Sequence, residues 1–107
     1  MNLNKKQMSL ENVVSQIGDR LISRNESLAT AESCTGGWVS MLITSVSGSS
    51  NWFDRGFVTY SNEAKEEMLS VSSQVIEIHG AVSEETARYM VLGAVEHSHA
   101  AAGLSVT

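Results

Sequence analysis

The spacing of apolar and polar residues predicts an alternation of helices and strands along the chain. Apolar residues recur at helical spacing from Ser9, a residue type that often caps helices, so we expect the first helix to begin there. The short, uncharged apolar run at 28–31 is typical of a buried strand, and the run at 56–60 indicates a second one. Helical spacing returns between and after these runs, before a third apparent strand at 104–107. The expected order is helix, strand, helix, strand, helix, helix and strand.

This order favours an α/β fold with a mostly parallel sheet flanked by helices. Ser61 and Ser83 each precede acidic residues of a first helical turn, so we expect them to cap the third and the last helix. The polar residues 1–8 are expected to form a flexible N-terminus ahead of a single domain, 9–107. The chain stops inside an apparent strand, and we therefore expect the domain to be incomplete at its C-terminus.

Composition narrows the possible classes of function. Hydrophobic residues make up 42% of the chain and charged residues 18%, as in globular proteins. The net charge of −5 argues against nucleic-acid binding, which needs a basic face. We find no apolar run long enough to span a membrane and no signal peptide. A single cysteine fits a reducing compartment, so we predict a cytoplasmic protein that binds neither nucleic acid nor membranes.

The turn from Glu32 to Gly37 is the first candidate for chemistry because it follows the first strand. Ligands of α/β proteins bind beyond the carboxyl ends of the strands, and two glycines let a ligand approach the backbone. Ser33 is placed there like a nucleophile, and the unpaired N–H groups that start the next helix suit an oxyanion. Capping of that helix by Ser33 and Thr35 is the simpler interpretation of the spacing alone.

Lys65 is the second candidate, about one helical turn beyond Tyr60 at the end of the second strand. Both side chains could reach over the same edge of the sheet. A lysine that loses its surrounding water can lose its proton and act as a base toward a serine. Free lysine titrates near ~10.4, so this role requires a large decrease in pKa. A solvated lysine beside Glu66 and Glu67 is the simpler alternative.

Three weaker features complete the candidates. The turn at 48–50 is either a polar loop or the source of a second serine. Cys34 is either a thiol nucleophile at a helix start or a small packed residue. His97 and His99 are two positions apart, so on a helix they point to different faces. No spacing of Cys, His and carboxylates suggests zinc, and we expect no metal site.

Four motifs, in this order, resemble the CinA C-terminal domain family. They are the segments 31–37, 48–50, 58–65 and 79–83, and the resemblance runs from about residue 9 to the end of the chain. It implies a three-layer α/β/α fold and, in active members, hydrolysis of nicotinamide mononucleotide to nicotinate mononucleotide and ammonia in pyridine nucleotide recycling. The expected partner is thus a small nucleotide substrate, and no cofactor is required.

The resemblance also implies roles for single residues. The family is described as serine amidohydrolases that use a serine and a lysine, and the motifs assign the base to Lys65 and a supporting role to Tyr60. Ser33 and Ser50 compete for the role of nucleophile, and we favour Ser33 because it lies at a helix start. Nine further residues are expected to bind the substrate, with Arg55 as a candidate for the phosphate: Glu32, Cys34, Thr35, Gly36, Gly37, Gly48, Ser49, Arg55 and Asn62.

The chain departs from the family pattern at its end. Family members continue beyond the third strand into a glycine-rich loop and further strand and helix, whereas this sequence ends at Thr107. Two alternatives to an active enzyme therefore stay open, a catalytically silent nucleotide-binding or assembly module and an unstable remnant without function. The exposed third strand also predicts a homo-oligomer formed through the edge of the sheet.

Overall fold

Three parallel strands form the central sheet of the computed structural model, which describes residues 3–107. They are β1 (Leu28–Glu32), β2 (Phe53–Val58) and β3 (Ala102–Val106), and β1 lies between the other two. The sequence predicted β1 almost to the residue. It placed β2 too late, because the backbone leaves the sheet soon after Val58. Thr59 still donates its N–H to the carbonyl of Glu32, at 2.8 Å.

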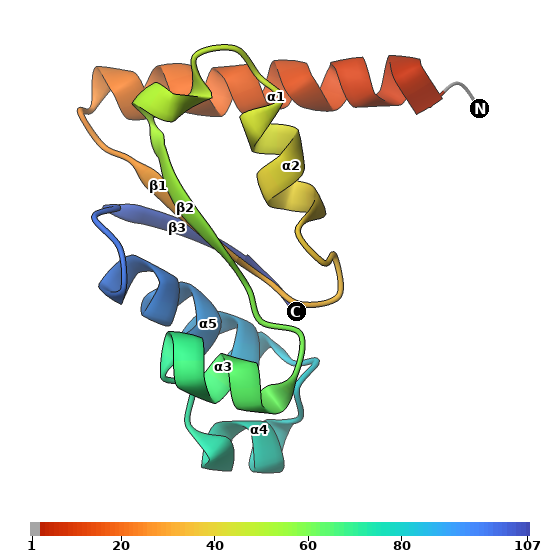
Figure 1. Ribbon diagram of the computed structural model, residues 1–107, viewed down its shortest axis with the longest axis vertical. Helices are drawn as coiled ribbons and strands as arrows, with labels where there is room; N and C mark the ends of the chain where they lie inside the picture. Colours follow the sequence, from red (N-terminus) through yellow and green to blue (C-terminus); the bar gives the residue numbers. More distant parts are fainter. Residues whose placement is uncertain (1–2) are drawn as a thin grey trace.

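Helices cover both faces of this sheet, as the α/β/α expectation requires (Figure 1). Helices α1 (Leu3–Ser23) and α2 (Trp38–Thr44) lie on one face, and a short 3-10 helix, η1 (Ser49–Asn51), precedes β2. The other face carries α3 (Asn62–Leu69), α4 (Ser73–His79) and α5 (Glu84–Glu96). The three-layer α/β/α fold is thus confirmed. None of the helices described is both long enough and apolar enough to cross a membrane.

The first helix starts earlier than its apolar spacing suggested. Helix α1 begins at Leu3, so Ser9 lies inside it and the predicted cap at Ser9 is wrong. The segment between them contains lysine, glutamine and methionine, which favour helices, and neither glycine nor proline. Of the expected N-terminal segment 1–8, residues 1 and 2 lie outside the described residues and the rest belong to α1.

The predicted caps of two later helices are confirmed. The side chain of Ser61 accepts a hydrogen bond from the N–H of Ala64 at the start of α3. Ser83 accepts one from the N–H of Thr86 at the start of α5. Because an N-cap fixes where a helix begins, Ser61 also fixes the position of Lys65 one turn further on.

Strand β1 is buried along its whole length, and its side chains alternate between two apolar clusters. Leu28 packs in the cluster beneath α1 and α2, whereas Ala29 and Ala31 pack in the cluster on the α5 side. The same alternation sends Glu32 toward α2 and the next residue, Ser33, toward α3. Two neighbouring polar residues thus leave the end of β1 on opposite faces of the sheet.

Candidate active site

Ser33 and Lys65 meet at the carboxyl end of the sheet. Ser33 follows β1, and Lys65 lies on α3, which follows β2. Lys65 Nζ is 3.2 Å from Ser33 Oγ and 3.1 Å from the backbone oxygen of Tyr60. Both residues are buried, with exposed fractions of 1% for Lys65 and 8% for Ser33. The alternative of a solvated Lys65 is therefore wrong.

Burial changes the acidity of this lysine. Loss of water around the amine lowers the pKa of Lys65 below its ordinary value. Among the ion pairs between described residues, none involves Lys65. A neutral amine can donate one hydrogen to the Tyr60 carbonyl while its lone pair accepts the Ser33 proton. The geometry suits a serine with its own general base.

The turn between β1 and α2 is not capped as the spacing suggested. Helix α2 begins after Gly37, and no side chain of Ser33 or Thr35 caps it. Thr35 instead donates its hydroxyl to the carboxylate of Glu32, at 2.7 Å. Gly36 and Gly37 adopt φ values of 62° and 106°, which only glycine adopts readily. The capping interpretation of Ser33 and Thr35 is therefore wrong.

The carboxylate of Glu32 caps the start of α2 instead. It accepts hydrogen bonds from the N–H groups of Val39 and Ser40, at 2.8 and 3.0 Å, and from the hydroxyls of Ser40 and Thr35. Burial alone would raise the pKa of Glu32, but these four hydrogen bonds outweigh it and the pKa lies below its usual value. The side chain has an exposed fraction of 0% and lies on the α2 face of the sheet, whereas Ser33 contacts Lys65 on the other face.

The backbone of the turn offers donors for a ligand. Within residues 3–107, the N–H groups of Cys34, Thr35 and Gly37 donate to no protein acceptor. Cys34 is exposed, and its thiol contacts the carbonyl of Thr107 at 3.4 Å. Free N–H groups next to a nucleophile are the usual donors to an oxyanion.

Tyr60 and Asn62 lie at the same end of the sheet. The Tyr60 carbonyl accepts a hydrogen bond from Lys65, whereas its side chain is 76% exposed. Asn62 is the exposed first residue of α3. Tyr60 thus contributes its backbone oxygen to the contact with Lys65.

The predicted site residues of the turn at 48–50 lie at the opposite end of β2. The turn of Gly48, Ser49 and Ser50 comes before β2, whereas Lys65 comes after it (Figure 1). A strand of this length spans roughly 17–20 Å, so Ser50 does not approach Lys65. Ser49 is buried and Ser50 exposed.

Arg55 also stays away from Ser33. It lies within β2, its Nε pairs with the carboxylate of Asp54 at 2.9 Å, and its guanidinium donates to the carbonyl of His97 at 3.3 Å. His97 and His99 are not near the candidate site either, since Asp54 at the start of β2 accepts the N–H of His99. Within the part of the chain that the structure describes, no group of three His, Cys, Asp or Glu could hold a metal ion.

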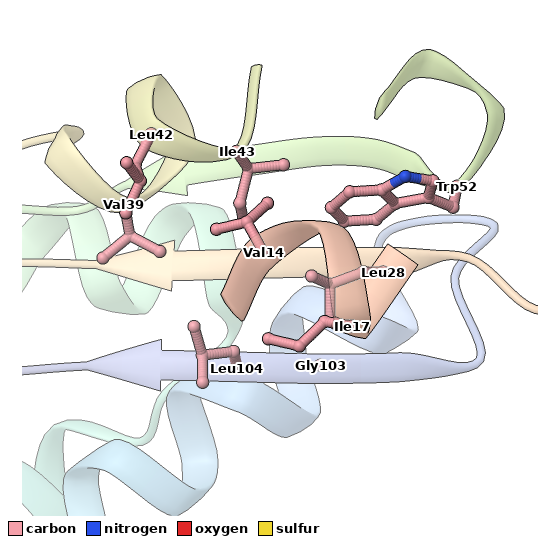
Figure 2. Close-up of a pocket in the computed structure, with 9 residues that line it drawn as sticks. All are labelled: Val14, Ile17, Leu28, Val39, Leu42, Ile43, Trp52, Gly103 and Leu104. Atoms are coloured by element: carbon pink, nitrogen blue, oxygen red, sulfur yellow. The ribbon is translucent and has the colours of Figure 1, made fainter. Parts of the chain in front are cut away.

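An apolar hollow of about 180 Å³ lies on the other face of the sheet (Figure 2). It opens between α1, α2 and β3 and contains no ionisable side chain. It is therefore separated from Ser33 by the sheet and offers no group for chemistry. Its lining comprises Val14, Ile17, Leu28, Val39, Leu42, Ile43, Trp52, Gly103 and Leu104.

Sequence comparisons relate the chain to known proteins. It is 49% identical over 92 residues to the Escherichia coli (strain K12) protein named nicotinamide-nucleotide amidohydrolase PncC. The matched segment covers 86% of this chain and 56% of that protein. It is 50% identical over 91 residues to a CinA-like protein of Chloroherpeton thalassium, covering 85% of this chain and 22% of that protein. The chain thus spans about half the length of the PncC relative and about a fifth of the length of the CinA-like protein.

Solved structures share the fold. The competence/damage inducible protein CihA of Agrobacterium tumefaciens matches with a TM-score of 0.87 and 41% identity, over 91% of this chain and 59% of that one. A CinA superfamily protein of Escherichia coli matches with a TM-score of 0.88 and 39% identity, over 91% and 56%. The family model of the CinA C-terminal domain matches residues 10–107. The chain therefore belongs to the CinA C-terminal domain family.

Proposed function

We propose that this chain carries the serine–lysine centre of an amidohydrolase that converts nicotinamide mononucleotide to nicotinate mononucleotide and ammonia. The observation that carries the proposal is the 3.2 Å contact between Ser33 Oγ and the buried amine of Lys65, whose pKa is lowered by loss of water. The substrate class is supported by the name of the PncC relative. Ser33 is the proposed nucleophile and Lys65 the proposed base.

The reaction would proceed in two steps. Neutral Lys65 takes the hydroxyl proton as Ser33 Oγ attacks the carboxamide carbon, and free N–H groups of the turn stabilise the oxyanion. The carbon–nitrogen bond then breaks as the Lys65 ammonium gives its proton to the amide nitrogen, which leaves as ammonia. In the second step Lys65 takes a proton from water, which attacks the ester, and returns it to Ser33.

Substrate binding is proposed for the carboxyl end of the sheet alone. The turn from Cys34 to Gly37 and the exposed Tyr60 and Asn62 lie there. Since the chain has a net charge of −5, the substrate phosphate needs local donors, and free backbone N–H groups are suited to that. Gly48, Ser49 and Arg55 lie too far away for this site, so we do not include them in it.

Ammonia release from nicotinamide mononucleotide tests the proposal. The Ser33→Ala variant should lose turnover by roughly 10³-fold or more while it still binds the mononucleotide in calorimetry, because only the nucleophile is removed. Ser50→Ala is the matched control and should keep its turnover, since Ser50 lies at the other end of β2. Retention of activity by Ser33→Ala would rule out the proposed nucleophile.

A second candidate function is a catalytically silent nucleotide-binding module. It is favoured by one observation, the free N–H groups of Cys34, Thr35 and Gly37, which could hold a phosphate without any turnover. In that case the folded protein binds nicotinamide mononucleotide in calorimetry but releases no ammonia. An assembly role would instead leave the mononucleotide unbound, and cooperative thermal unfolding would argue against an unstable remnant.

A further inference from the structure

Among the described residues, Glu32 is the one fully buried carboxylate beside the candidate site, and the proposed reaction does not use it. Its side chain lies on the α2 face of the sheet, whereas Ser33 points to the α3 face. Its backbone is fixed as well, because its carbonyl accepts the N–H of Thr59. The next residue, Ser33, donates its N–H to the carbonyl of Val106 in β3. Glu32 is therefore held from both neighbouring strands at the point where the turn begins.

The carboxylate connects the two ends of that turn. One oxygen accepts from the Thr35 hydroxyl and the Val39 N–H, and the other accepts from the N–H and the hydroxyl of Ser40. Between these anchor points lie Gly36 and Gly37 with positive φ, which leave the backbone free to adopt other conformations. Two backbone hydrogen bonds also lie within the turn, from the Gly36 N–H to the Ser33 carbonyl and from the Trp38 N–H to the Thr35 carbonyl, but α2 has no other side-chain cap.

Only an ionised carboxylate satisfies all these donors. A glutamine in the same place would present an NH₂ group on one side of its amide. In one orientation that group faces the N–H of Val39, and in the other it faces the N–H of Ser40. Either way two donors oppose each other in a buried place. The low pKa of Glu32 is consistent with this environment, since every contact favours the charged form.

We infer that Glu32 is a positioning residue, whose carboxylate fixes the turn from Ser33 to Gly37 against α2 and thereby holds Ser33 Oγ within reach of Lys65 Nζ. This inference rests on the proposed amidohydrolase function for its effect on catalysis. Glu32 was expected to bind the substrate, but its carboxylate contacts only other residues of the protein, and the inferred role is structural. Glu32 acts through the turn and does not touch the reacting atoms.

Steady-state kinetics of the Glu32→Gln variant test this inference. We expect kcat for ammonia release to fall about 10²-fold with KM little changed, because small displacements of a reacting group reduce turnover on this scale. Val14→Ala is the matched control, since it removes buried methyl groups of α1 on the same face of the sheet and leaves the four hydrogen bonds of Glu32 in place. It should lower the Tm but keep kcat, when both are assayed well below their melting temperatures. A kcat in Glu32→Gln equal to that of Val14→Ala would overturn the inference.

A second readout separates this inference from the proposed function. Amide resonances of Cys34 to Gly37 in ¹H–¹⁵N spectra should shift in Glu32→Gln, and the Gly36 amide, which donates to the Ser33 carbonyl, should exchange faster with solvent. All of them should stay unchanged in Val14→Ala. If the wild-type chain releases no ammonia, the proposed function fails while these spectra still decide the role of Glu32. Unperturbed amides would contradict that role.

Should Glu32→Gln fail to fold, Ser40→Ala decides the question. It removes one hydroxyl donor to the carboxylate and leaves the Ser40 N–H in place. We expect perturbed amides between Cys34 and Gly37 and a kcat lowered several-fold with KM unchanged. Wild-type amides and wild-type kcat in Ser40→Ala would overturn the inference.

Discussion

At the scale of single residues, Lys65 loses its water because α3 places it against the end of β1 and the Tyr60 carbonyl. The free energy of burying an amine is unfavourable, and the protein retains a hydrogen bond to Tyr60 and one to Ser33 in exchange. The same burial lowers the pKa and creates a base. Stability and reactivity are therefore expected to change in opposite directions when Lys65 is replaced.

Two substitutions of Lys65 test this opposition. Lys65→Met should abolish ammonia release but raise the Tm by roughly 4–8 °C, the shift expected for ~1 kcal/mol in a small domain, because an apolar chain of similar length needs no water. Lys65→Arg should also abolish activity, since arginine keeps its proton. Thermal unfolding and the ammonia assay measure both effects. A large decrease in Tm for Lys65→Met would show that burial of the Lys65 amine does not destabilise the folded protein.

The pH dependence of turnover follows from the same pKa. The proposed base works only when neutral, so kcat/KM should rise with pH as Lys65 loses its proton. Because burial lowers the pKa, this rise should be centred below the ordinary lysine value of about 10.4. Initial rates across neutral to alkaline pH measure it. A rise centred at the ordinary value would show that Lys65 is not the base.

The lowered pKa of Glu32 predicts that the stability of the folded protein depends on pH. This pKa is lower in the folded protein than in the unfolded chain, where it is about 4.3. Its contribution to stability is thus fully present above about 4.3 and is lost as the pH falls through the folded value. Urea unfolding between pH 3 and 6 should show a stability difference between wild type and Glu32→Gln that shrinks toward acid. A difference independent of pH would contradict this assignment.

At the scale of elements, α3 carries the base, and its place depends on close packing against α5. Gly93 of α5 faces the backbone of Leu69 at the end of α3, and a Cβ at Gly93 would lie 2.0 Å from the Leu69 oxygen. The two helices can approach this closely only because residue 93 has no side chain. The position of Lys65 is therefore set partly by a glycine that has no contact with the site.

Gly93→Ala tests this dependence on packing. The added methyl must push α3 and α5 apart, so we expect the free energy of unfolding to fall by roughly 1–3 kcal/mol. Ammonia release should fall as well, because Lys65 moves with α3. Glu96→Ala, an exposed change on the same helix, is the control and should leave both unaltered. Wild-type stability and turnover in Gly93→Ala would show that the helices tolerate the displacement.

At the scale of the whole molecule, the sheet has an open edge. Among the described residues β3 pairs with β1 alone, and its Leu104 is 45% exposed beside the apolar hollow of Figure 2. An unpaired strand edge is a template for pairing with another chain. The homo-oligomer expected from the sequence stays a prediction, with β3 as its proposed interface, and cytoplasmic location stays a prediction as well.

Sedimentation velocity measures this association directly. We expect a concentration-dependent dimer for the wild-type chain and a shift toward monomer for Leu104→Lys, because a charge on the edge opposes pairing. Glu96→Gln at an exposed position also raises the net charge by one unit and serves as the control. A wild-type chain that stays monomeric at all concentrations would exclude the edge as a contact between copies.

The sequence by itself determined the elements and the family. The buried run of β1 and the caps Ser61 and Ser83 follow from local spacing and from capping chemistry, which act within a few residues. The expected order of elements was wrong at one point, because three helices and not two lie between β2 and β3. The resemblance to the CinA C-terminal domain family, confirmed by the match over residues 10–107, also rests on local motifs. It placed Ser33 and Lys65 among the candidates.

Only the tertiary structure decided which candidates meet. Ser33 and Lys65 are 32 positions apart, and their contact depends on β1 and β2 lying side by side and ending at the same edge. The same topology separates Ser50 from Lys65, although both lie in motifs of one family. Sequence spacing favoured a solvated Lys65 and a capping Ser33, because burial and the capping role of Glu32 arise from contacts between elements. A pattern within one element carries no information about such contacts.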